Sequence, residues 1–393
     1  MFSNSIATGL ISAAVVVLGL TVIAFIVRKR NEAALKKFER EAAIEAVRLK
    51  REAERAEQEK GSATAEHADE VSASEGGPAK NILHIATTGG AASTHKSVGN
   101  VESGGVASSL KFLGSGKPSK LQNQNIAEET MRITKAREYV VNGKRVSLGN
   151  HDVAHVYVLS PEKTDVFLDD TDGFLKNKAY IATKTSYVFV NQDSFEAARR
   201  YGRNPLVMNF ASARHPGGGF RTGASAQEES LCRASTLYAS LTSQDAAVMY
   251  DFNNMHELPA YSDYMLLSDQ VAVFRDASGA LLPTPFSCGV ITVPAPNRNG
   301  SARSLSKEEL DDIIHERLRR MLLSGIRYRY HTIVLGAWGC GVFGNPTEEI
   351  AEAFHRLLIE EGLGDHFDTV VFAVYRDEKK LSVFRKTFKD VAE

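Results

Sequence analysis

The chain has 393 residues, more than one compact core usually needs, so we expect one large domain together with additional segments. Its 47 Lys and Arg residues nearly balance 48 Asp and Glu residues, which argues against direct DNA or RNA binding through phosphate neutralisation. Its 3 cysteines lie far apart, with no CxxC or Cys/His metal spacing. This pattern argues against a disulfide framework and indicates a reducing compartment.

The first feature along the chain is an apolar stretch at residues 6–27 that carries no charged side chain. As a helix with a rise of about 1.5 Å per residue, it would be roughly 33 Å long, enough to span a bilayer core. Arg28, Lys29 and Arg30 follow directly, and such a basic end stays on the cytoplasmic side of a membrane. The sequence predicts a transmembrane anchor in residues 1–30, with the rest of the chain facing the cytosol.

A cleaved signal peptide is the alternative interpretation of this stretch. It requires a basic segment before the apolar run, a shorter run and a small-residue cleavage site after it. The chain has none of these features, so we favour the anchor, in a membrane that the sequence does not specify.

Two polar segments follow the anchor. Residues 31–60 are rich in Ala, Glu, Lys and Arg, and pairs such as Glu32 and Lys36 have the spacing of helical neighbours. Because apolar residues are too sparse for a continuous seam, we predict a charged helical stalk rather than a coiled coil. Residues 61–120 are dominated by Gly, Ser, Ala and Thr, a composition typical of a flexible linker.

The segment 121–393 has the pattern of a globular domain. We expect helices at 127–139, 194–201, 226–241, 307–323, 347–361 and 378–391, and strands at 187–190, 205–210, 289–293, 332–335 and 369–374. Continuously apolar strands that alternate with amphipathic helices predict a mainly parallel sheet covered on both faces. Ligands of such sheets bind at the carboxyl ends of the strands.

The first glycine-rich loop follows the strand predicted at 205–210. Three consecutive glycines, residues 217–219, would let the backbone approach a ligand closely. Ser225 and Glu228 have the Ser-x-x-Glu spacing of a capping box, which predicts the start of a helix there. Glu228 and Glu229 then lie in its first turn, and adjacent helix positions point about 100° apart, so each carboxylate should have its own partners.

A carboxylate pair beside a glycine loop suits the hydrolysis of a glycosidic bond. One carboxylate can orient a sugar hydroxyl, while the other, kept from water, can protonate the leaving oxygen as an oxocarbenium-like centre forms. The alternative is that both acids have no catalytic role and simply lie at a helix N-terminus, where acidic residues are favoured.

The second glycine-rich loop, residues 336–344, leaves the strand predicted at 332–335 and enters a helix that opens at Pro346. Its glycines would let backbone N–H groups turn toward an anion, and the helix dipole adds to this, which suits a diphosphate. The Gly-Lys-Ser/Thr of a P-loop is missing. A turn without a ligand is the alternative, and Phe343 could pack on a ribose, a base or the core.

The sequences of both loops resemble motifs of a known family. The stretch NFASARHPGGG at 209–219, followed by Gln-Glu-Glu at 227–229, resembles the GGG…QEE signature of the microbial-type catalytic domain of poly(ADP-ribose) glycohydrolases. The loop GAWGCGVFGNP at 336–346 resembles that family's diphosphate-binding loop. The resemblance covers most of the chain from residue 126 onward, and the predicted anchor and stalk lie outside it. It implies a macrodomain-like α/β/α sandwich with a mainly parallel mixed sheet, and hydrolysis of the ribose–ribose bonds of poly(ADP-ribose) without a metal or cofactor.

Carried over by position, the resemblance assigns roles to the acidic triplet. Glu229 is expected to protonate the leaving ribose oxygen and then to activate water. Glu228 is expected to bind ribose hydroxyls, and Gln227 to help fix the loop. Ser212 stands where some family members carry an asparagine that contacts the distal ribose, so either Asn209 or Ser212 could make that contact.

The resemblance also assigns the two loops to the substrate. The first loop would close over the diphosphate and the distal ribose through Gly217, Gly218 and Gly219. The second loop would contribute Gly339, Gly341, Val342 and Phe343, with Phe343 set against the ribose. The expected substrates are poly(ADP-ribose) or ADP-ribosylated proteins.

Other chemistry-bearing residues are expected to be structural. Cys232 lies one turn beyond Glu229, but no histidine is placed by the sequence to activate it, so we expect it to pack in the core. We expect the same of Trp338 and Cys340, and we expect His215 to be solvated. The acids at 169–172 are interpreted as a turn rather than a Mg²⁺ site.

Alternative functions share much of the expected site. A hydrolase that removes mono-ADP-ribose from a side chain would use the same pocket and glutamate. A reader domain would bind ADP-ribose without cleaving it, although the presence of Glu229 speaks against this alternative. An inert tethered scaffold is the alternative that the intact signature favours least.

Overall fold

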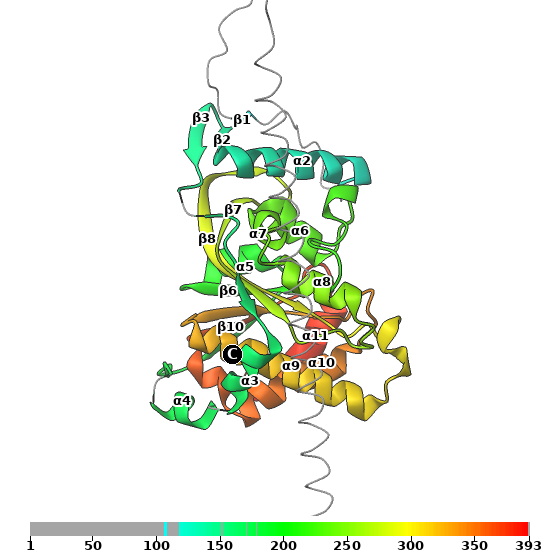
Figure 1. The fold of residues 1–393 in the computed structure, drawn as a ribbon. Helices are drawn as coiled ribbons and strands as arrows, with labels where there is room; N and C mark the ends of the chain where they lie inside the picture. The colour runs from blue at the N-terminus through cyan, green and yellow to red at the C-terminus, as the bar shows by residue number, and fades with distance from the viewer. Residues whose placement is uncertain (1–105, 108–117, 151, 170, 178, 392–393) are drawn as a thin grey trace, which may run out of the picture. The chain divides into compact units, whose positions relative to one another are not determined.

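The computed structural model describes residues 106–107, 118–150, 152–169, 171–177 and 179–391 (Figure 1). The predicted anchor, the predicted stalk and most of the predicted linker therefore lie outside the described residues. Within the described part of the chain, no helix is both long enough and apolar enough to cross a membrane.

A seven-stranded sheet organises this part of the chain in the order β4-β7-β8-β6-β9-β10-β5. The strands are β4 (Tyr157–Leu159), β5 (Ser186–Val190), β6 (Pro205–Ala211), β7 (Met265–Arg275), β8 (Leu281–Pro294), β9 (Thr332–Leu335) and β10 (Thr369–Ala373). The run from β8 to β5 is parallel, whereas β7 and β4 are antiparallel to their neighbours. The prediction of a mainly parallel mixed sheet is confirmed.

The helices pack on the two faces of this sheet (Figure 1). They are α2 (Lys120–Ala136), α3 (Pro161–Asp169), α4 (Thr171–Asn177), α5 (Ser194–Tyr201), α6 (Gln227–Ala234), α7 (Leu237–Leu241), α8 (Ala247–Met255), α9 (Lys307–Arg327), α10 (Thr347–His355) and α11 (Glu378–Thr387). The shorter turns are η1 (Phe220–Thr222), η2 (Ser301–Ser304), the π-helical turn η3 (Arg356–Glu360) and η4 (Leu363–His366). The resulting α/β fold has a mixed sheet between helical layers.

Strand β6 shows why the two faces differ. Successive side chains of a strand point to opposite faces. Leu206 and Met208 belong to the large core cluster that also contains residues of α9, α10 and α11. Asn209 points the other way, toward α6, where it meets Glu228. The strand therefore anchors the core with one face and presents a polar group to α6 with the other.

Several expected elements differ in extent from the observed ones. The helix predicted at 226–241 divides into α6 and α7, because Ser235 has an extended backbone (φ −151°, ψ −179°) and bridges Val273 of β7. The helix predicted at 127–139 begins earlier, where Ser119 and Gln122 form a capping box, and the chain turns at Arg137 (φ 62°) into β2 (Glu138–Val141). The helix predicted at 347–361 ends in the π-helical turn η3.

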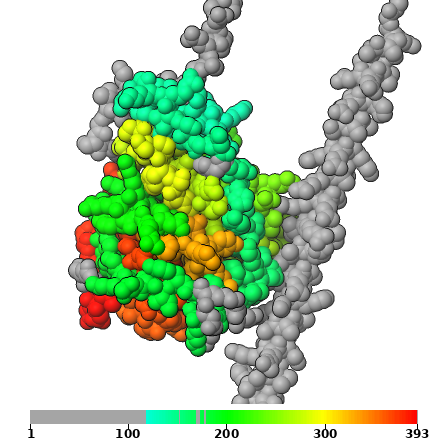
Figure 2. All heavy atoms as spheres, turned by 90° about the vertical axis from the view of Figure 1, so that its left-hand side faces the viewer, coloured from blue at the N-terminus to red at the C-terminus, as the bar shows by residue number. Residues whose placement is uncertain are grey.

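Of the β7–β8 hairpin, only the strand at 289–293, which is part of β8, was predicted. The small sheet beside the hairpin was not predicted. Pro283 and Pro285 lie within β8, and prolines in a sequence run argue against a strand. The small sheet contains β1 (Val106–Ala107), within the predicted linker, and the hairpin of β2 (Glu138–Val141) and β3 (Lys144–Ser147). In Figure 2 the cyan segment from α2 to β3 lies against the yellow hairpin, where the Tyr139 hydroxyl donates to the Leu282 carbonyl at 2.6 Å.

Candidate active site

Both glycine loops leave the same edge of the sheet from adjacent strands. β6 pairs in parallel with β9, so the carboxyl ends of these strands, and the loops that follow them, are neighbours. β8 lies on the other side of β6, with Ala211 opposite Pro294, so the segment 295–300 leaves the same edge. The loops 212–219, 295–300 and 336–344 therefore meet around the carboxyl ends of three parallel strands.

The first glycine loop has a backbone that only glycine adopts readily. Gly217 and Gly218 have φ values of 67° and 54°, in the left-handed region. A Cβ atom at Gly218 would stand 2.5 Å from Oε1 of Glu229 and 3.2 Å from Oε2 of Glu228. The missing side chain at Gly218 therefore lets the loop lie directly against both carboxylates.

Helix α6 starts without the predicted capping box. Ala226 is the N-cap residue and has no side-chain cap, so the predicted cap at Ser225 is wrong. The reason is that the Glu228 carboxylate does not turn back to the start of its own helix. It bonds instead to the end of β6, where Oε2 accepts from the Ser212 N–H at 2.8 Å. The acidic pair still occupies the first turn, as expected.

Glu228 is held by donors on both of its oxygens. It is 2% exposed, and its Oε1 accepts from Nδ2 of Asn209 at 3.3 Å. The Asn209 amide also donates to Oγ1 of Thr292 at 3.1 Å. Burial raises the pKa of Glu228 to about 8, and the Ser212 and Asn209 donors oppose that rise. Both oxygens of Glu228 are thus occupied by protein donors.

Glu229 differs from its neighbour because one of its oxygens is free. Its Oε1 accepts from the Gly219 N–H at 2.9 Å. Its Oε2 is buried and has no hydrogen-bond partner among the described residues. The side chain is 7% exposed, so little of it meets solvent. A buried polar atom normally has a partner, so this oxygen is the one that a substrate could engage.

Gln227 ties α6 to the sheet rather than to the loop. Its Oε1 accepts from the Phe210 N–H at 2.9 Å, and its Nε2 donates to the Met208 carbonyl at 2.8 Å and to Oγ of Ser194 at 3.1 Å. Its amide therefore pairs with the backbone of β6 and also reaches α5. This bond pattern sets the position of the two following glutamates relative to the strand end.

The two residues between which the sequence could not decide lie in different environments. Asn209 is fully buried beneath Glu228. Ser212 is half-buried, and its hydroxyl oxygen accepts from the N–H groups of His215 and Arg214 at 3.1 and 3.4 Å. The Ser212 hydroxyl thus lies nearer to solvent at the mouth of the loop than the Asn209 amide does.

The base of the second glycine loop is part of the protein core. Trp338 is fully buried and donates from Nε1 to the Val293 carbonyl at 2.8 Å. Asn345 donates from Nδ2 to the carbonyls of Pro296 and Gly339 at 2.9 and 3.2 Å, and Gly339, with φ 70°, leaves room for that amide. The loop is therefore fastened to the end of β8 and to the segment that follows it.

The tip of the same loop is open. Val342 is 83% exposed, and a Cβ atom at Gly341 would meet nothing within 4 Å. Phe343 is half-buried and packs against the core cluster, while Pro346 is the N-cap of α10 rather than its first residue. A rigid base with an open tip between glycines is suited to receiving a ligand.

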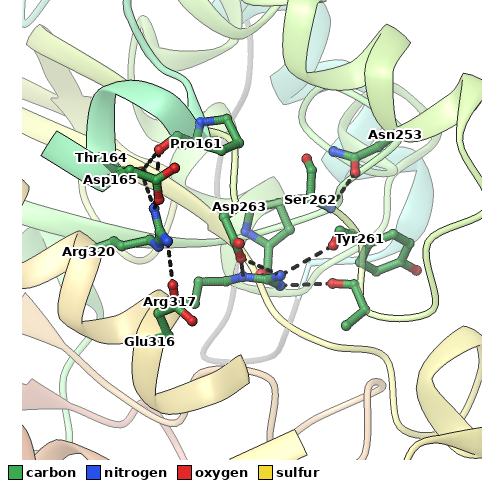
Figure 3. Close-up of polar contacts among 12 residues, drawn as sticks. Pro161, Thr164, Asp165, Asn253, Tyr261, Ser262, Asp263, Glu316, Arg317 and Arg320 are labelled. Atoms are coloured by element: carbon green, nitrogen blue, oxygen red, sulfur yellow. Dashed lines mark hydrogen bonds and ion pairs between the residues drawn. The ribbon is translucent and has the colours of Figure 1, made fainter. Parts of the chain in front are cut away.

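A buried arginine supports this edge of the sheet from α9 (Figure 3). Arg317 is 1% exposed, and its Nη1 donates to the Ala260 and Pro294 carbonyls at 2.9 and 3.0 Å. Its Nε and Nη2 groups lie 2.9 and 2.8 Å from Oδ1 of Asp263. Tyr261, whose φ is 62°, accepts from Nη2 through its carbonyl oxygen. Arg317 thus fixes the carboxyl end of β8, from which the supporting segment departs.

Three contributors to this edge were not predicted from the sequence: Arg317, Thr292 and Asn345. Nothing in the local pattern marks them, since each acts through a residue far away in the sequence. By contrast, the residues expected to pack do so: Cys232 and Cys340 are buried, and burial raises the pKa of the Cys232 thiol well above its usual range. His215 is exposed.

A cluster that could hold a metal ion is absent from the described residues. Of the acids at 169–172, Asp169 ends α3 and Asp172 lies in α4 by the course of the backbone, and their side chains lie outside the described set. At the strand edge, the carboxylates of Glu228 and Glu229 lie beside the main chain of the first glycine loop.

The fold is α/β, and a pair of carboxylates lies beside a glycine loop at the carboxyl edge of its sheet, an arrangement that suits a glycosidase. The family model described as the catalytic domain of microbial-type poly(ADP-ribose) glycohydrolase matches residues 127–276. A poly(ADP-ribose) glycohydrolase structure from Thermomonospora curvata is 36% identical, with a TM-score of 0.63, and the match covers 68% of this chain and 99% of that chain. A search of the curated proteins finds no match.

Structures with bound ligands are also similar. The Thermomonospora curvata protein bound to the inhibitor ADP-HPD is 35% identical over 68% of this chain and 99% of that chain, with a TM-score of 0.61. The Deinococcus radiodurans poly(ADP-ribose) glycohydrolase in complex with ADP-ribose is 34% identical over 61% of this chain and 95% of that chain, with a TM-score of 0.55. The chain belongs to the poly(ADP-ribose) glycohydrolase family.

Proposed function

We propose that this chain, as a glycosidase of that family, hydrolyses the ribose–ribose O-glycosidic bonds of poly(ADP-ribose) and releases ADP-ribose, with Glu229 as general acid and base. The observation that carries the proposal is the free Oε2 of Glu229, a buried carboxyl oxygen without a partner among the described residues beside a glycine loop. Such an oxygen can hold a proton within reach of a glycosidic oxygen and release it as the bond breaks.

In the proposed reaction, Glu229 first donates a proton to the leaving group and later accepts one from water. The carboxyl group of Glu229 protonates the leaving ribose oxygen, and the developing positive charge spreads over the anomeric carbon and the ring oxygen. The resulting carboxylate takes a proton from water as the water attacks the anomeric carbon. The Gly219 N–H, at 2.9 Å from Oε1, holds the side chain in one orientation during both steps.

Glu228 has a different role in this proposal. One protein donor on each oxygen, from Ser212 and Asn209, holds the carboxyl group in place, and the second lone pair of each oxygen can accept from a ribose hydroxyl. We assign the distal ribose contact to Ser212, because its hydroxyl is nearer to solvent than the buried Asn209 amide. Gln227 supports both by fixing the start of α6 to β6.

The two glycine loops would hold the rest of the substrate. Gly217, Gly218 and Gly219 bring main-chain atoms against the carboxylates, so the distal ribose and the diphosphate can approach without meeting side chains. Gly339, Gly341, Val342 and Phe343 face the same edge from β9, with main-chain N–H groups for the diphosphate and the Phe343 ring for the ribose.

The test compares the full-length chain with Glu229→Gln, which keeps the shape of the side chain and removes its exchangeable proton. Each is incubated with automodified poly(ADP-ribose) and with a mono-ADP-ribosylated protein, and free ADP-ribose is followed by chromatography. We expect release from the polymer by the wild type only, with ADP-ribose binding retained in the variant. From mutations of groups that act as general acids, the expected loss is at least about 100-fold.

The other outcomes identify the alternatives. Release from the mono-modified protein alone would indicate a mono-ADP-ribosyl hydrolase, and binding of ADP-ribose without release from either substrate would indicate a reader module. Turnover by Glu229→Gln at the wild-type rate would contradict the role given to Glu229.

We also propose that residues 6–27 anchor the chain in a membrane, with the family domain on the cytosolic side. The support is the uncharged apolar run and the basic residues that follow it, both of which lie outside the described residues. An anchor of this kind would restrict where ADP-ribose is released.

A further inference from the structure

A side-chain amide outside both glycine loops holds the tip of the second one. Asn299 lies between β8 and η2 and is exposed. Its Nδ2 group donates to the Val342 carbonyl at 3.0 Å, and its own N–H donates to the Phe343 carbonyl at 3.2 Å. Asn299 thus holds two successive peptide units of the loop.

Gly344 provides the space for this contact. A Cβ atom at Gly344 would stand 2.4 Å from Nδ2 of Asn299 and 2.5 Å from its Cγ. The residue has a φ of 73°, so glycine is favoured there by its backbone as well. The amide of Asn299 therefore lies directly over Gly344.

The held segment is a β-turn. The Gly344 N–H donates to the Gly341 carbonyl at 3.1 Å, which leaves Val342 and Phe343 as its two central residues. Type I and type II turns differ in the direction of the peptide between those residues, and type II requires a positive φ at the second of them. Phe343 has no positive φ, so the turn has the type I orientation.

The direction of the carbonyls determines the direction of the amides. The described residues contain no cis peptide bond, and in a trans peptide the C=O and N–H groups point to opposite sides. With its carbonyl directed at Asn299, the central peptide points the Phe343 N–H away from Asn299. Within the described part of the chain, the N–H groups of Gly341, Val342 and Phe343 donate to no acceptor.

We propose that Asn299 is a positioning residue for substrate binding, which orients the turn 341–344 so that its free main-chain N–H groups face the diphosphate of ADP-ribose. The inference rests on the proposed function of the second loop. Without the Asn299 amide, the central peptide can rotate, and a rotated peptide directs the Val342 carbonyl oxygen toward the phosphates. An anion is repelled by that oxygen, whereas it is attracted by N–H groups.

The experiment uses the full-length chain with Asn299→Ala and Asn299→Asp. Aspartate keeps the shape and the main-chain N–H of the residue but cannot donate to the Val342 carbonyl. The matched control is Asn191→Ala, because Asn191 also follows a strand of the sheet and holds a neighbouring loop, accepting from the Arg376 N–H at 2.7 Å. Calorimetry measures the Kd of ADP-ribose, and steady-state kinetics on poly(ADP-ribose) measures KM and kcat separately.

We expect both Asn299 variants to raise the Kd and the KM about tenfold, the effect of weakening hydrogen bonds to a charged group, with kcat changed by less than about threefold. Asn191→Ala should keep the wild-type values. Three outcomes would each overturn the proposal. They are wild-type Kd and KM in both Asn299 variants, a fall in kcat without a change in Kd or KM, and an equal rise in Kd and KM in Asn191→Ala. If the wild type binds ADP-ribose but releases none, the proposed function fails, and the calorimetric comparison still decides the role of Asn299.

Discussion

At the scale of single residues, two adjacent glutamates have different environments because their hydrogen-bond partners differ. Glu228 is held on both oxygens by the end of β6, whereas Glu229 is held on one oxygen by the glycine loop. Neighbouring positions on a helix point in different directions, so one helical turn can deliver one carboxylate to the strand and the other to the loop. This division requires Gly218 to lie against both side chains.

Gly218→Ala tests this close approach. A Cβ atom there would stand 2.5 Å from Oε1 of Glu229, so the carboxylate or the loop must move. We expect turnover to fall by at least about tenfold, since misplacing a reacting group by 1 Å can cost 100-fold. The control is Gly143→Ala, which also has a positive φ, 73°, but meets nothing within 4 Å. An equal loss of turnover in both variants would mean that backbone strain, and not the carboxylate contact, is responsible.

The raised pKa of Glu228 predicts a pH dependence of stability. The pKa of this carboxyl is raised to about 8 in the folded protein, against an ordinary value of 4.5. Between these pH values the folded state keeps a proton that the unfolded state has lost, so the free energy of unfolding falls as pH rises toward 8. One proton corresponds to a slope of about 1.4 kcal/mol per pH unit. The contribution is complete below the lower pKa and is lost above the higher one.

Glu228→Gln removes this titration and should flatten the stability profile across that range. The measurement is urea unfolding of the wild type and the variant at several pH values within it, from which the difference in slope is obtained. Parallel profiles for the two proteins would show that Glu228 has the same pKa in the folded and unfolded states.

At the scale of elements, the strand edge depends on α9 and on the segment after β8. Arg317 of α9 holds the Pro294 carbonyl at the end of β8, and the Pro296 carbonyl two residues later accepts from Asn345 of the second loop. Each bond joins parts of the chain that are distant in sequence. The second loop is therefore positioned by successive hydrogen bonds, of which the first comes from the buried Arg317.

Arg317→Met should destabilise the protein, because Asp263 and three carbonyls lose a buried cationic partner. Breaking such a buried pair costs about 3 kcal/mol. The control is Arg319→Met on the same helix, whose partly exposed pair with Glu361 should contribute less than about 1 kcal/mol. Urea unfolding measures both losses, and similar values for the two variants would contradict the assigned difference.

Two predicted elements have the observed bounds, namely α5, which begins directly after its Asp193 cap, and β9. β9 is buried at every position, and its extent was predicted without error. The end of α6 was predicted wrongly, because Ser235 leaves the helix and forms a β-bridge with Val273 of β7. A local pattern of apolar residues cannot reveal a backbone pairing with a distant strand, and for the same reason it could not reveal the β7–β8 hairpin.

At the scale of the whole molecule, the chain combines a family domain with an N-terminal region that lies outside the described residues. Deleting residues 1–30 tests the proposed anchor. We expect the shortened chain to move from the membrane fraction to the soluble fraction of cells and to release ADP-ribose from the polymer at the rate of the full-length chain, because the proposed site lies within 209–344. Retention of the shortened chain in the membrane fraction would contradict an anchor in that segment.

The amino-acid sequence was enough to predict three features: the mainly parallel sheet, the placement of both glycine loops after strands, and the candidate glutamates. These features are local: strand and helix periodicity, glycine runs and the triplet at 227–229 can be recognised without knowing what packs against what. Two further features became apparent only in the folded structure: Glu228 is held by β6 while Oε2 of Glu229 has no hydrogen-bond partner among the described residues, and Arg317, Asn299 and Asn345 support the loops. Those features depend on contacts between segments that are distant in sequence. Such contacts form only when the chain folds, because folding brings these side chains and main-chain groups within hydrogen-bond distance.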